Sequence, residues 1–284
     1  MHFGASMFFT DYSMTPQALA TALEERGFES LWAPEHSHIP LSRKTPFIFG
    51  GDLPKKYYDV MDPFVTLTAA ALASTTLKVG TGVCLINQRD PIQTAKLVAS
   101  IDQISGGRFL FGIGNGWNQD EMEDHGTVFE TRHQLVRERV EAMKEIWTKS
   151  KAEYHGDFVK FDPMMAWPKP VQKPYPPILV GGAFPYSARR AIRYADGWMP
   201  QLTAKMQLPF ADQISRFRQM CGEAGRDPAT VPVSVWGRSP DHDELASYRD
   251  IGVERVCTSL DSAKEDEILP LLDKWAGIIR RING

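Results

Sequence analysis

The sequence is poor in cysteine and contains no long hydrophobic run. Its 3 cysteines, Cys84, Cys221 and Cys257, are odd in number and far apart, so neither a disulfide framework nor a paired-cysteine metal site is expected. No apolar run approaches the roughly 20 residues that a membrane-spanning helix needs. The apolar segment 3–9 has no cationic region before it and Asp11 closes it, which argues against a signal peptide. We therefore expect a cytoplasmic protein with no membrane partner.

Charges of the two signs are nearly balanced. The chain has 32 Lys and Arg residues against 35 Asp and Glu residues, a formal net charge of −3. Without a basic excess, nucleic acid is not an expected partner. The length of 284 residues suits one α/β barrel, a fold that takes roughly 250 residues. We expect residues 1–284 to form a single domain.

Strand-like and helix-like segments alternate eight times along the chain. Alternation of this kind predicts a parallel sheet with helical crossovers, and eight units close naturally into a (β/α)8 TIM barrel. The competing fold, an open doubly wound sheet, would use fewer strands and a phosphate loop after the first strand, where residues 8–11 offer none. The expected strands are Phe3–Phe9, Ser30–Pro34, Leu77–Leu85, Phe109–Ile113, Ile178–Val180, Gly197–Leu202, Val231–Trp236 and Val253–Leu260, and the expected helices are Thr15–Gly27, Asp62–Ser74, Pro91–Ser105, Thr131–Lys149, Tyr186–Ala195, Pro209–Ala224, Asp241–Ile251 and Glu265–Arg281.

Two segments depart from this alternation. A long loop over residues 37–61, after the second strand, carries Phe47, Phe49 and Tyr57, and aromatics in so long a loop favour an ordered lid. A small hairpin is expected over residues 153–161, after the fourth helix, from its alternating pattern around Gly156.

The stretch Gly107–Trp117 carries glycines at 112, 114 and 116, at the end of a buried strand. A dinucleotide fingerprint would need glycine at position 117, and it would open a helix at once, whereas helical periodicity returns only at Thr131. The glycines therefore indicate a site of another kind, with a flat group against the backbone. For Gly80 and Gly112 we prefer packing inside the barrel as the explanation.

In a barrel, functional groups gather at the carboxyl ends of the strands. Glu35 and His36 end the second strand; His36 suits a general acid or base, and Glu35 could orient it or make its own polar contact. Gly181–Gly182 precede a helix with Arg189 and Arg190 near its start, which predicts an anion site.

A metal site is the alternative at the same edge. His36 and His38 form an H-x-H pair of the kind found in barrel metallohydrolases, but the ends of the fifth and sixth strands add no histidine. We expect no closed ligand set, and hence no metal, and keep metallohydrolase as the weaker alternative.

Four motifs together resemble the luciferase-like monooxygenases, the bacterial-luciferase superfamily, and within it the branch of F420-dependent oxidoreductases. The resemblance covers roughly residues 1–200 and thins after that. Its motifs are Ser30–His36, Leu77–Val83, Ser105–Trp117 and Pro177–Gly182 with Ala195–Trp198.

The resemblance implies a barrel that binds coenzyme F420 or, alternatively, FMN at its mouth. His36 matches the acid/base residue beside the ring, and Glu35 matches an acidic residue near the cofactor. Gly82 and Val83 match a bulge, often with a non-proline cis peptide bond, that presses on the ring. Asn115 and Gly116 match cofactor contacts, and Gly181 and Gly182 match the phosphate-binding turn.

One residue departs from the family pattern. Trp117 stands where the sugar-phosphate dehydrogenases of the family carry a catalytic glutamate, so we assign it to the substrate pocket and exclude that substrate. The resemblance then predicts F420-dependent hydride transfer to or from a small organic substrate, in a homodimer. That the substrate is partly apolar is expected from the aromatic and methionine residues at the mouth, Trp117, Phe47, Phe49, Met61 and Trp236. An FMN-dependent monooxygenase of the same fold and a cofactor-storing protein without activity are the alternatives.

Overall fold

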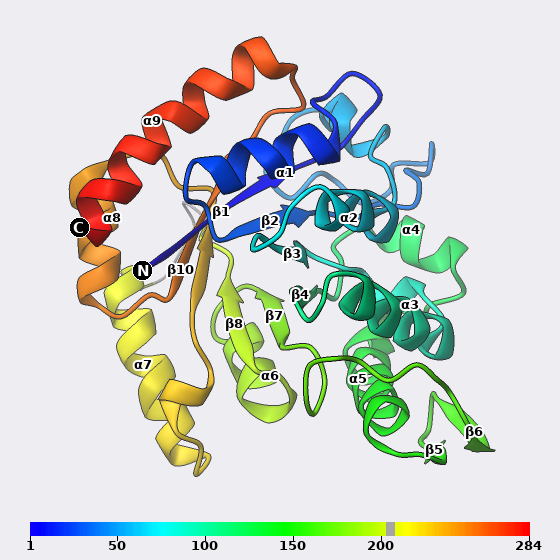
Figure 1. Ribbon diagram of the computed structural model, residues 1–284. Helices are drawn as coiled ribbons and strands as arrows, with labels where there is room; N and C mark the ends of the chain where they lie inside the picture. The colour runs from blue at the N-terminus through cyan, green and yellow to red at the C-terminus, as the bar shows by residue number, and fades with distance from the viewer. Residues whose placement is uncertain (203–207) are drawn as a thin grey trace.

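The computed structural model describes residues 1–202 and 208–284, and it confirms the predicted (β/α)8 barrel. Eight parallel strands follow the order β8-β7-β4-β3-β2-β1-β10-β9. A further bridge between Trp198 and Val233 joins β8 to the segment before β9 and closes the ring (Figure 1). The strands are β1 His2–Met7, β2 Ser30–Ala33, β3 Lys78–Thr81, β4 Phe109–Ile113, β7 Ile178–Gly182, β8 Gly197–Pro200, β9 Ser234–Trp236 and β10 Arg255–Leu260.

Helices surround the barrel, and several begin at the caps that the sequence provides. The side chains of Thr15, Asp62 and Asp90 each accept a hydrogen bond from a backbone N–H of the first turn, and a proline follows each of them. Such a cap stabilises a helix by about 1 kcal/mol, and proline at the first position costs no hydrogen bond. The outer helices are α1 Pro16–Glu25, α2 Pro63–Leu72, α3 Pro91–Ile104, α5 Arg132–Thr148, α6 Tyr186–Tyr194, α7 Phe210–Glu223, α8 His242–Asp250 and α9 Glu265–Asn283.

Trp32 fills the inside of the barrel. A Cβ atom added at Gly80 would lie 2.5 Å from the Trp32 ring, and one added at Gly112 would lie 2.0 Å from the Thr81 carbonyl oxygen. Both glycines therefore serve packing, as preferred from the sequence. The Trp236 ring caps this layer, with its centroid 4.9 Å from that of Trp32.

Two predicted strands are shorter than expected by at least three residues. The expected strand 77–85 ends at Thr81, since the chain leaves the sheet at Gly82–Val83. That peptide bond is cis, as the family resemblance implies. The expected strand 231–236 pairs only over β9, from Ser234.

The segment after β4 corrects the sequence interpretation. Helical structure returns not at Thr131 but already at Gln119, in the short helix α4, Gln119–Asp124. Its polar sequence has no hydrophobic periodicity, so the spacing of apolar residues does not indicate this helix. The predicted hairpin is confirmed as β5 Ala152–His155 with β6 Lys160–Met164.

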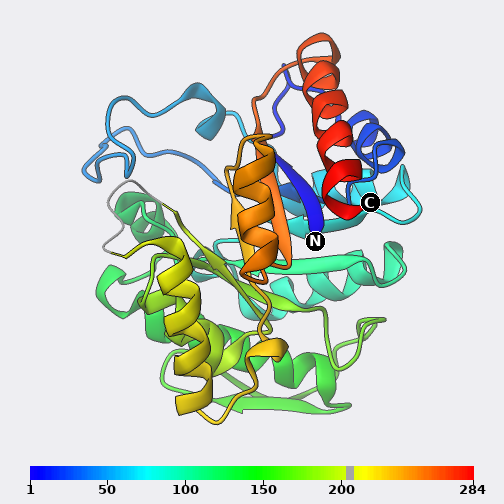
Figure 2. The ribbon, with the colours of Figure 1, turned by 90° about the vertical axis from the view of Figure 1, so that its left-hand side faces the viewer.

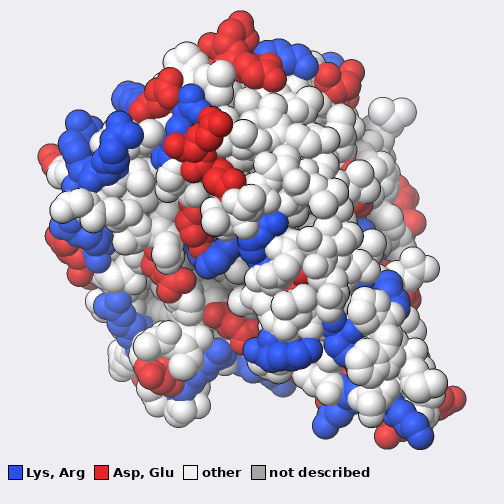
Figure 3. Space-filling view, viewed as in Figure 1, with Lys and Arg blue, Asp and Glu red and all other residues white. Residues whose placement is uncertain are grey.

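The long loop between β2 and α2 stands out from one end of the barrel (Figure 2). It is the end at which the strands finish, so the loop lies over the expected mouth. Figure 3 shows charged side chains of both signs intermixed over the face seen in Figure 1, in keeping with the balanced composition. Within residues 1–202 and 208–284, no helix has the length and apolar character needed to cross a membrane.

Candidate active site

His36 and Glu121 form a buried pair at the mouth. The Nδ1 atom of His36 lies 2.8 Å from Oε2 of Glu121, and the two side chains are 7% and 0% exposed. The other carboxylate oxygen, Oε1, accepts a hydrogen bond from the backbone N–H of Ser37 at 3.1 Å. An ionised carboxylate can only accept a hydrogen bond, so this contact assigns the ring hydrogen of His36 to Nδ1. The other ring nitrogen, Nε2, is then left to exchange a proton with a ligand.

Glu121 was missed by the sequence analysis. It belongs to the first turn of α4, where the helix dipole favours an acidic side chain. A signal was present, because Asn118 followed three residues later by Glu121 is the spacing of a helix start. Asn118 is indeed the N-cap residue of α4, and the helix delivers the carboxylate to His36.

The neighbouring acid of α4, Asp120, fastens the long loop. Its carboxylate accepts hydrogen bonds from Ser42 Oγ at 2.5 Å, Lys44 N at 2.8 Å and Thr45 Oγ1 at 3.1 Å. Burial acts to raise the pKa of Asp120, but these hydrogen bonds outweigh it and hold the pKa below its ordinary value. One short helix thus positions both the histidine and the loop above it.

Aromatic rings of the loop, together with Trp117 from the segment after β4, close over His36. The ring centroid of Tyr57 lies 5.3 Å from that of His36, and the ring of Trp117 lies 5.9 Å from it. Phe47 contacts both of these aromatic rings, at 5.3 Å from Tyr57 and 5.8 Å from Trp117. The loop is therefore ordered against the site, as expected of a lid; that Trp117 contacts substrate stays a prediction.

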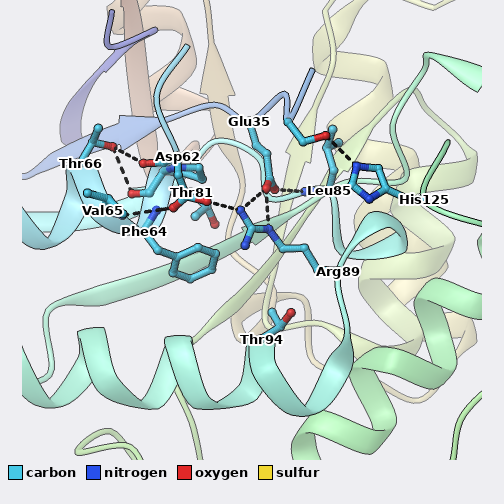
Figure 4. Close-up of polar contacts among 12 residues, drawn as sticks. Glu35, Asp62, Phe64, Val65, Thr66, Thr81, Leu85, Arg89, Thr94 and His125 are labelled. Carbon is cyan, nitrogen blue, oxygen red and sulfur yellow. Dashed lines mark hydrogen bonds and ion pairs between the residues drawn. The ribbon is translucent and has the colours of Figure 1, made fainter. Parts of the chain in front are cut away.

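Glu35 makes its own polar contact and does not orient His36. Its carboxylate accepts a hydrogen bond from the backbone N–H of Leu85 at 2.6 Å and forms an ion pair with Arg89 (Figure 4). Arg89 also pairs with Asp62, the cap of α2, at 2.6 Å. Glu35 thus secures the segment after the cis bulge, and a direct contact with a cofactor stays a prediction.

The ends of β3, β4 and β7 come together around Val83. A Cβ atom at Gly114 would lie 2.6 Å from a methyl carbon of Val83, and one at Gly181 would lie 3.1 Å from the other. Gly116, with a φ of 66°, packs against Met122, which a Cβ would meet at 2.6 Å. These glycines let the bulge side chain lie between two strand ends.

Asn115 carries an unsatisfied donor in this region. Its side chain is buried, and within the described part of the chain its Nδ2 atom has no hydrogen-bond partner. An unpaired buried donor costs about 1–3 kcal/mol, so such groups normally have a partner. Asn115 is therefore suited to donate to a bound group.

A cationic cluster lies beside the Gly181–Gly182 turn. A Cβ at Gly182, whose φ of 133° favours glycine, would lie 3.3 Å from Nη2 of Arg190. Desolvation and then the charges of Arg132 and Arg190 lower the pKa of His133 to about 4. The Nε atoms of both arginines are buried and, among the described residues, unpartnered. Arg132 was not predicted, since it is distant in sequence from the glycine turn.

The metal-binding alternative gains no support. His36 and His38 face different carboxylates, because Nε2 of His38 lies 2.9 Å from Oδ2 of Asp124. Over residues 1–202 and 208–284, no three His, Cys, Asp or Glu side chains are grouped so that they could hold a metal ion.

Three relatives illustrate the range of similar sequences. The Mycobacterium tuberculosis protein Rv0953c is 37% identical over 97% of this chain and 98% of its own length. An F420-dependent hydroxymycolic acid dehydrogenase of the same organism is 27% identical over 75% of this chain and 55% of its length. An FMNH2-dependent dimethylsulfone monooxygenase of Pseudomonas putida is 33% identical over 46% of this chain and 37% of its length.

Solved structures share the fold. The monooxygenase RslO1 from Streptomyces bottropensis superposes with a TM-score of 0.81 at 20% identity, over 100% of both chains. An F420-dependent secondary alcohol dehydrogenase superposes with a TM-score of 0.76 at 17% identity, over 99% of this chain and 98% of its own. The family described as luciferase-like monooxygenase matches residues 15–240. The chain therefore belongs to the luciferase-like monooxygenase family.

Proposed function

We propose that the protein is an F420-dependent oxidoreductase that transfers hydride to or from a small, partly apolar organic substrate. The observation that carries this proposal is the cationic cluster of Arg132 and Arg190 beside Gly182, at the same mouth as the His36–Glu121 pair. An anion site and an acid/base pair at one barrel mouth suit a cofactor that has a phosphate at one end and a reactive ring at the other.

The residues at the mouth fit such a cofactor. Arg132, Arg190 and the Gly181–Gly182 turn would hold its phosphate, which would supply the partner that the two buried Nε atoms lack. Asn115 would donate its unpaired amide hydrogen to the ring system.

The bound cofactor supplies the hydride chemistry, and the protein supplies the proton. Oxidation of an alcohol requires removal of the hydroxyl proton as the hydride leaves carbon, and reduction of a ketone requires its return. His36 performs this transfer at Nε2, because Glu121 holds its other nitrogen and stabilises the protonated ring. The aromatic side chains of Phe47, Tyr57 and Trp117 exclude water from the reacting groups.

F420 is preferred to FMN on the strength of the family branch that the motifs resemble. The relative that is F420-dependent matches over 75% of this chain, while the FMNH2-dependent relative matches over less than half of it. FMN-dependent monooxygenation remains the second candidate, since both cofactors combine a phosphate with a flat ring.

A cofactor-coupled screen tests the proposal. Purified protein is mixed anaerobically with F420 and a panel of alcohols, or with reduced F420 and the matching ketones and aldehydes, and deazaflavin absorbance is followed. A parallel series uses reduced FMN with oxygen and looks for oxygenated products. We expect substrate-dependent change only in the F420 series, lost in His36→Ala. Turnover only with reduced FMN and oxygen would select the second candidate.

A further inference from the structure

A groove of about 840 Å³ runs along the outside of the barrel between α6 and α7. These two helices lie side by side (Figures 1 and 2). The groove is lined at one end by Phe184 and Pro185, which follow the Gly181–Gly182 turn after a single alanine. It therefore opens where the proposed phosphate site ends.

The groove carries an excess of positive charge. Arg189 and Arg193 are exposed, lie one helical turn apart on α6 and both line it. Arg216 contributes a third guanidinium from α7, but it pairs with Glu223, also in the lining, at 2.8 Å. In the part of the chain that the structure describes, no carboxylate pairs with Arg189 or Arg193. The positive charges of these two guanidinium groups are therefore not neutralised by an ion pair.

The rest of the lining is largely apolar. Ile192, Leu208 and Met220 lie between the charged groups. A ligand that matches this surface has carboxylates spaced along a flexible hydrocarbon chain, because the carboxylates meet arginines and the methylene groups meet the apolar side chains.

Three other cations, all in the lid, already have partners. Lys55 pairs with Asp59 at 2.6 Å, and Lys56 pairs with Asp261 at 3.3 Å. Arg43 donates to the hydroxyl of Tyr58 at 3.1 Å. The groove is thus better suited than the lid to bind an acidic chain.

We propose that the groove binds the acidic polyglutamate tail of F420, an inference that rests on the proposed function. A phosphate held at Gly181–Gly182 would place the tail at the groove's opening, beside Phe184. FMN ends at its phosphate and would leave the groove empty. The groove therefore selects the tailed deazaflavin over FMN.

The test compares F420 that carries a tail of several glutamates with the same molecule lacking them. Dissociation constants are measured for the wild type, for Arg189→Ala/Arg193→Ala and for the control Arg280→Ala/Arg281→Ala, whose arginines are exposed on α9. We expect the wild type and the control to bind the tailed form about three- to tenfold more tightly, as suits a few exposed ion pairs. That preference should fall to near unity in the groove variant, with unchanged affinity for the tailless form.

The outcomes separate this inference from the proposed function. If the wild type binds both forms equally, the groove assignment is wrong and the cofactor assignment stands. If the groove variant also loses affinity for the tailless form, Arg189 and Arg193 serve the phosphate and not the tail, which overturns the inference. If neither form binds, the proposed function fails and this inference fails with it.

Discussion

Glu121 links the backbone of Ser37 to the ring of His36, with its two oxygens 3.1 Å from the Ser37 nitrogen and 2.8 Å from His36 Nδ1. One buried carboxylate therefore fixes both the ring and the chain that carries it. Because the contact reaches from α4 to the end of β2, it makes the position of His36, the proposed proton-transfer group, depend on this short helix.

Replacement of Glu121 should impair turnover more than binding. In Glu121→Gln the charge that stabilises a protonated His36 is lost, so we expect turnover to fall about tenfold or more, with cofactor affinity changed less than about twofold. The assay uses the first substrate found in the cofactor-coupled screen. Glu123→Gln, at an exposed position of the same helix, is the control.

A second readout distinguishes positioning from a merely structural role. Nitrogen chemical shifts of the His36 ring should report hydrogen on Nδ1 in the wild type and a mixture of tautomers in Glu121→Gln. In a double-mutant cycle with His36→Ala, the two effects should be strongly non-additive. Additive losses would mean that Glu121 acts independently of His36.

Asp120 should control the order of the lid. In Asp120→Ala the backbone N–H of Lys44 and the hydroxyls of Ser42 and Thr45 lose their acceptor. We expect faster amide hydrogen exchange over residues 42–45, and a higher KM because the aromatic cover is less often closed. Glu123→Ala, at an exposed position of α4, should leave exchange in this segment unchanged. Unaltered protection in Asp120→Ala would show that other contacts hold the loop.

His133 offers a titration test of the phosphate site. Desolvation and the charges of Arg132 and Arg190 hold its pKa at about 4, so protonation as pH falls from about 6.5 to 4 disfavours the folded state. A phosphate bound between the arginines reduces that positive potential. The pKa of His133, followed by NMR, should therefore rise on addition of inorganic phosphate or FMN, and should not respond to them in Arg190→Ala. An unchanged pKa in the wild type would place the phosphate elsewhere.

Glu24 ties α1 to the start of β3 and should contribute stability that depends on pH. Its Oε1 atom accepts hydrogen bonds from the backbone N–H groups of Thr76 at 2.5 Å and Leu77 at 2.9 Å. Burial acts to raise the pKa of Glu24, but the hydrogen bond from the Thr76 hydroxyl, these two backbone bonds and one from the backbone of Thr75 bring it to about 2, against 4.5 in an ordinary carboxyl. The contribution is thus complete above pH 4.5 and lost as pH falls toward 2.

The expected change is measurable by thermal unfolding. Glu24→Gln should cost about 1–3 kcal/mol at pH 7, which for a chain of this length lowers Tm by roughly 2–10 °C. The difference from the wild type should shrink as pH falls below 4.5. Glu25→Gln, at the neighbouring exposed position, should change little at any pH. A difference in Tm between Glu24→Gln and the wild type that does not depend on pH would contradict a stabilising role of the Glu24 carboxylate.

The barrel could be predicted from the sequence because its strands are buried on both faces and its helices begin at clear caps, as at Thr15 and Asp62. For these strands and helix starts, the local sequence pattern was sufficient to predict the element. The position of His36 at the mouth followed from the strand-end rule, and so did the glycine turn between β7 and α6; that this turn binds an anion stays a prediction.

The rest depended on contacts between distant residues. Helix α4 is short and polar, so its pattern resembles that of a surface loop, and Glu121 is buried only because tertiary structure brings it to His36. Arg132 likewise comes close to Arg190, which lies beside the glycine turn, only through the fold. For Glu35, adjacency to His36 suggested a partnership, yet its partner Arg89 lies 54 residues away.

Titration of the purified protein with F420 and with FMN is the most direct test of the central claim. The account predicts that F420 binds with a dissociation constant well below about 1 mM, more tightly than FMN, and that Arg132→Ala/Arg190→Ala weakens both. The variant His36→Ala should bind F420 with nearly unchanged affinity, because the proposed role of His36 is to transfer a proton and not to hold the phosphate. Failure of both cofactors to bind the wild type below about 1 mM would contradict the account.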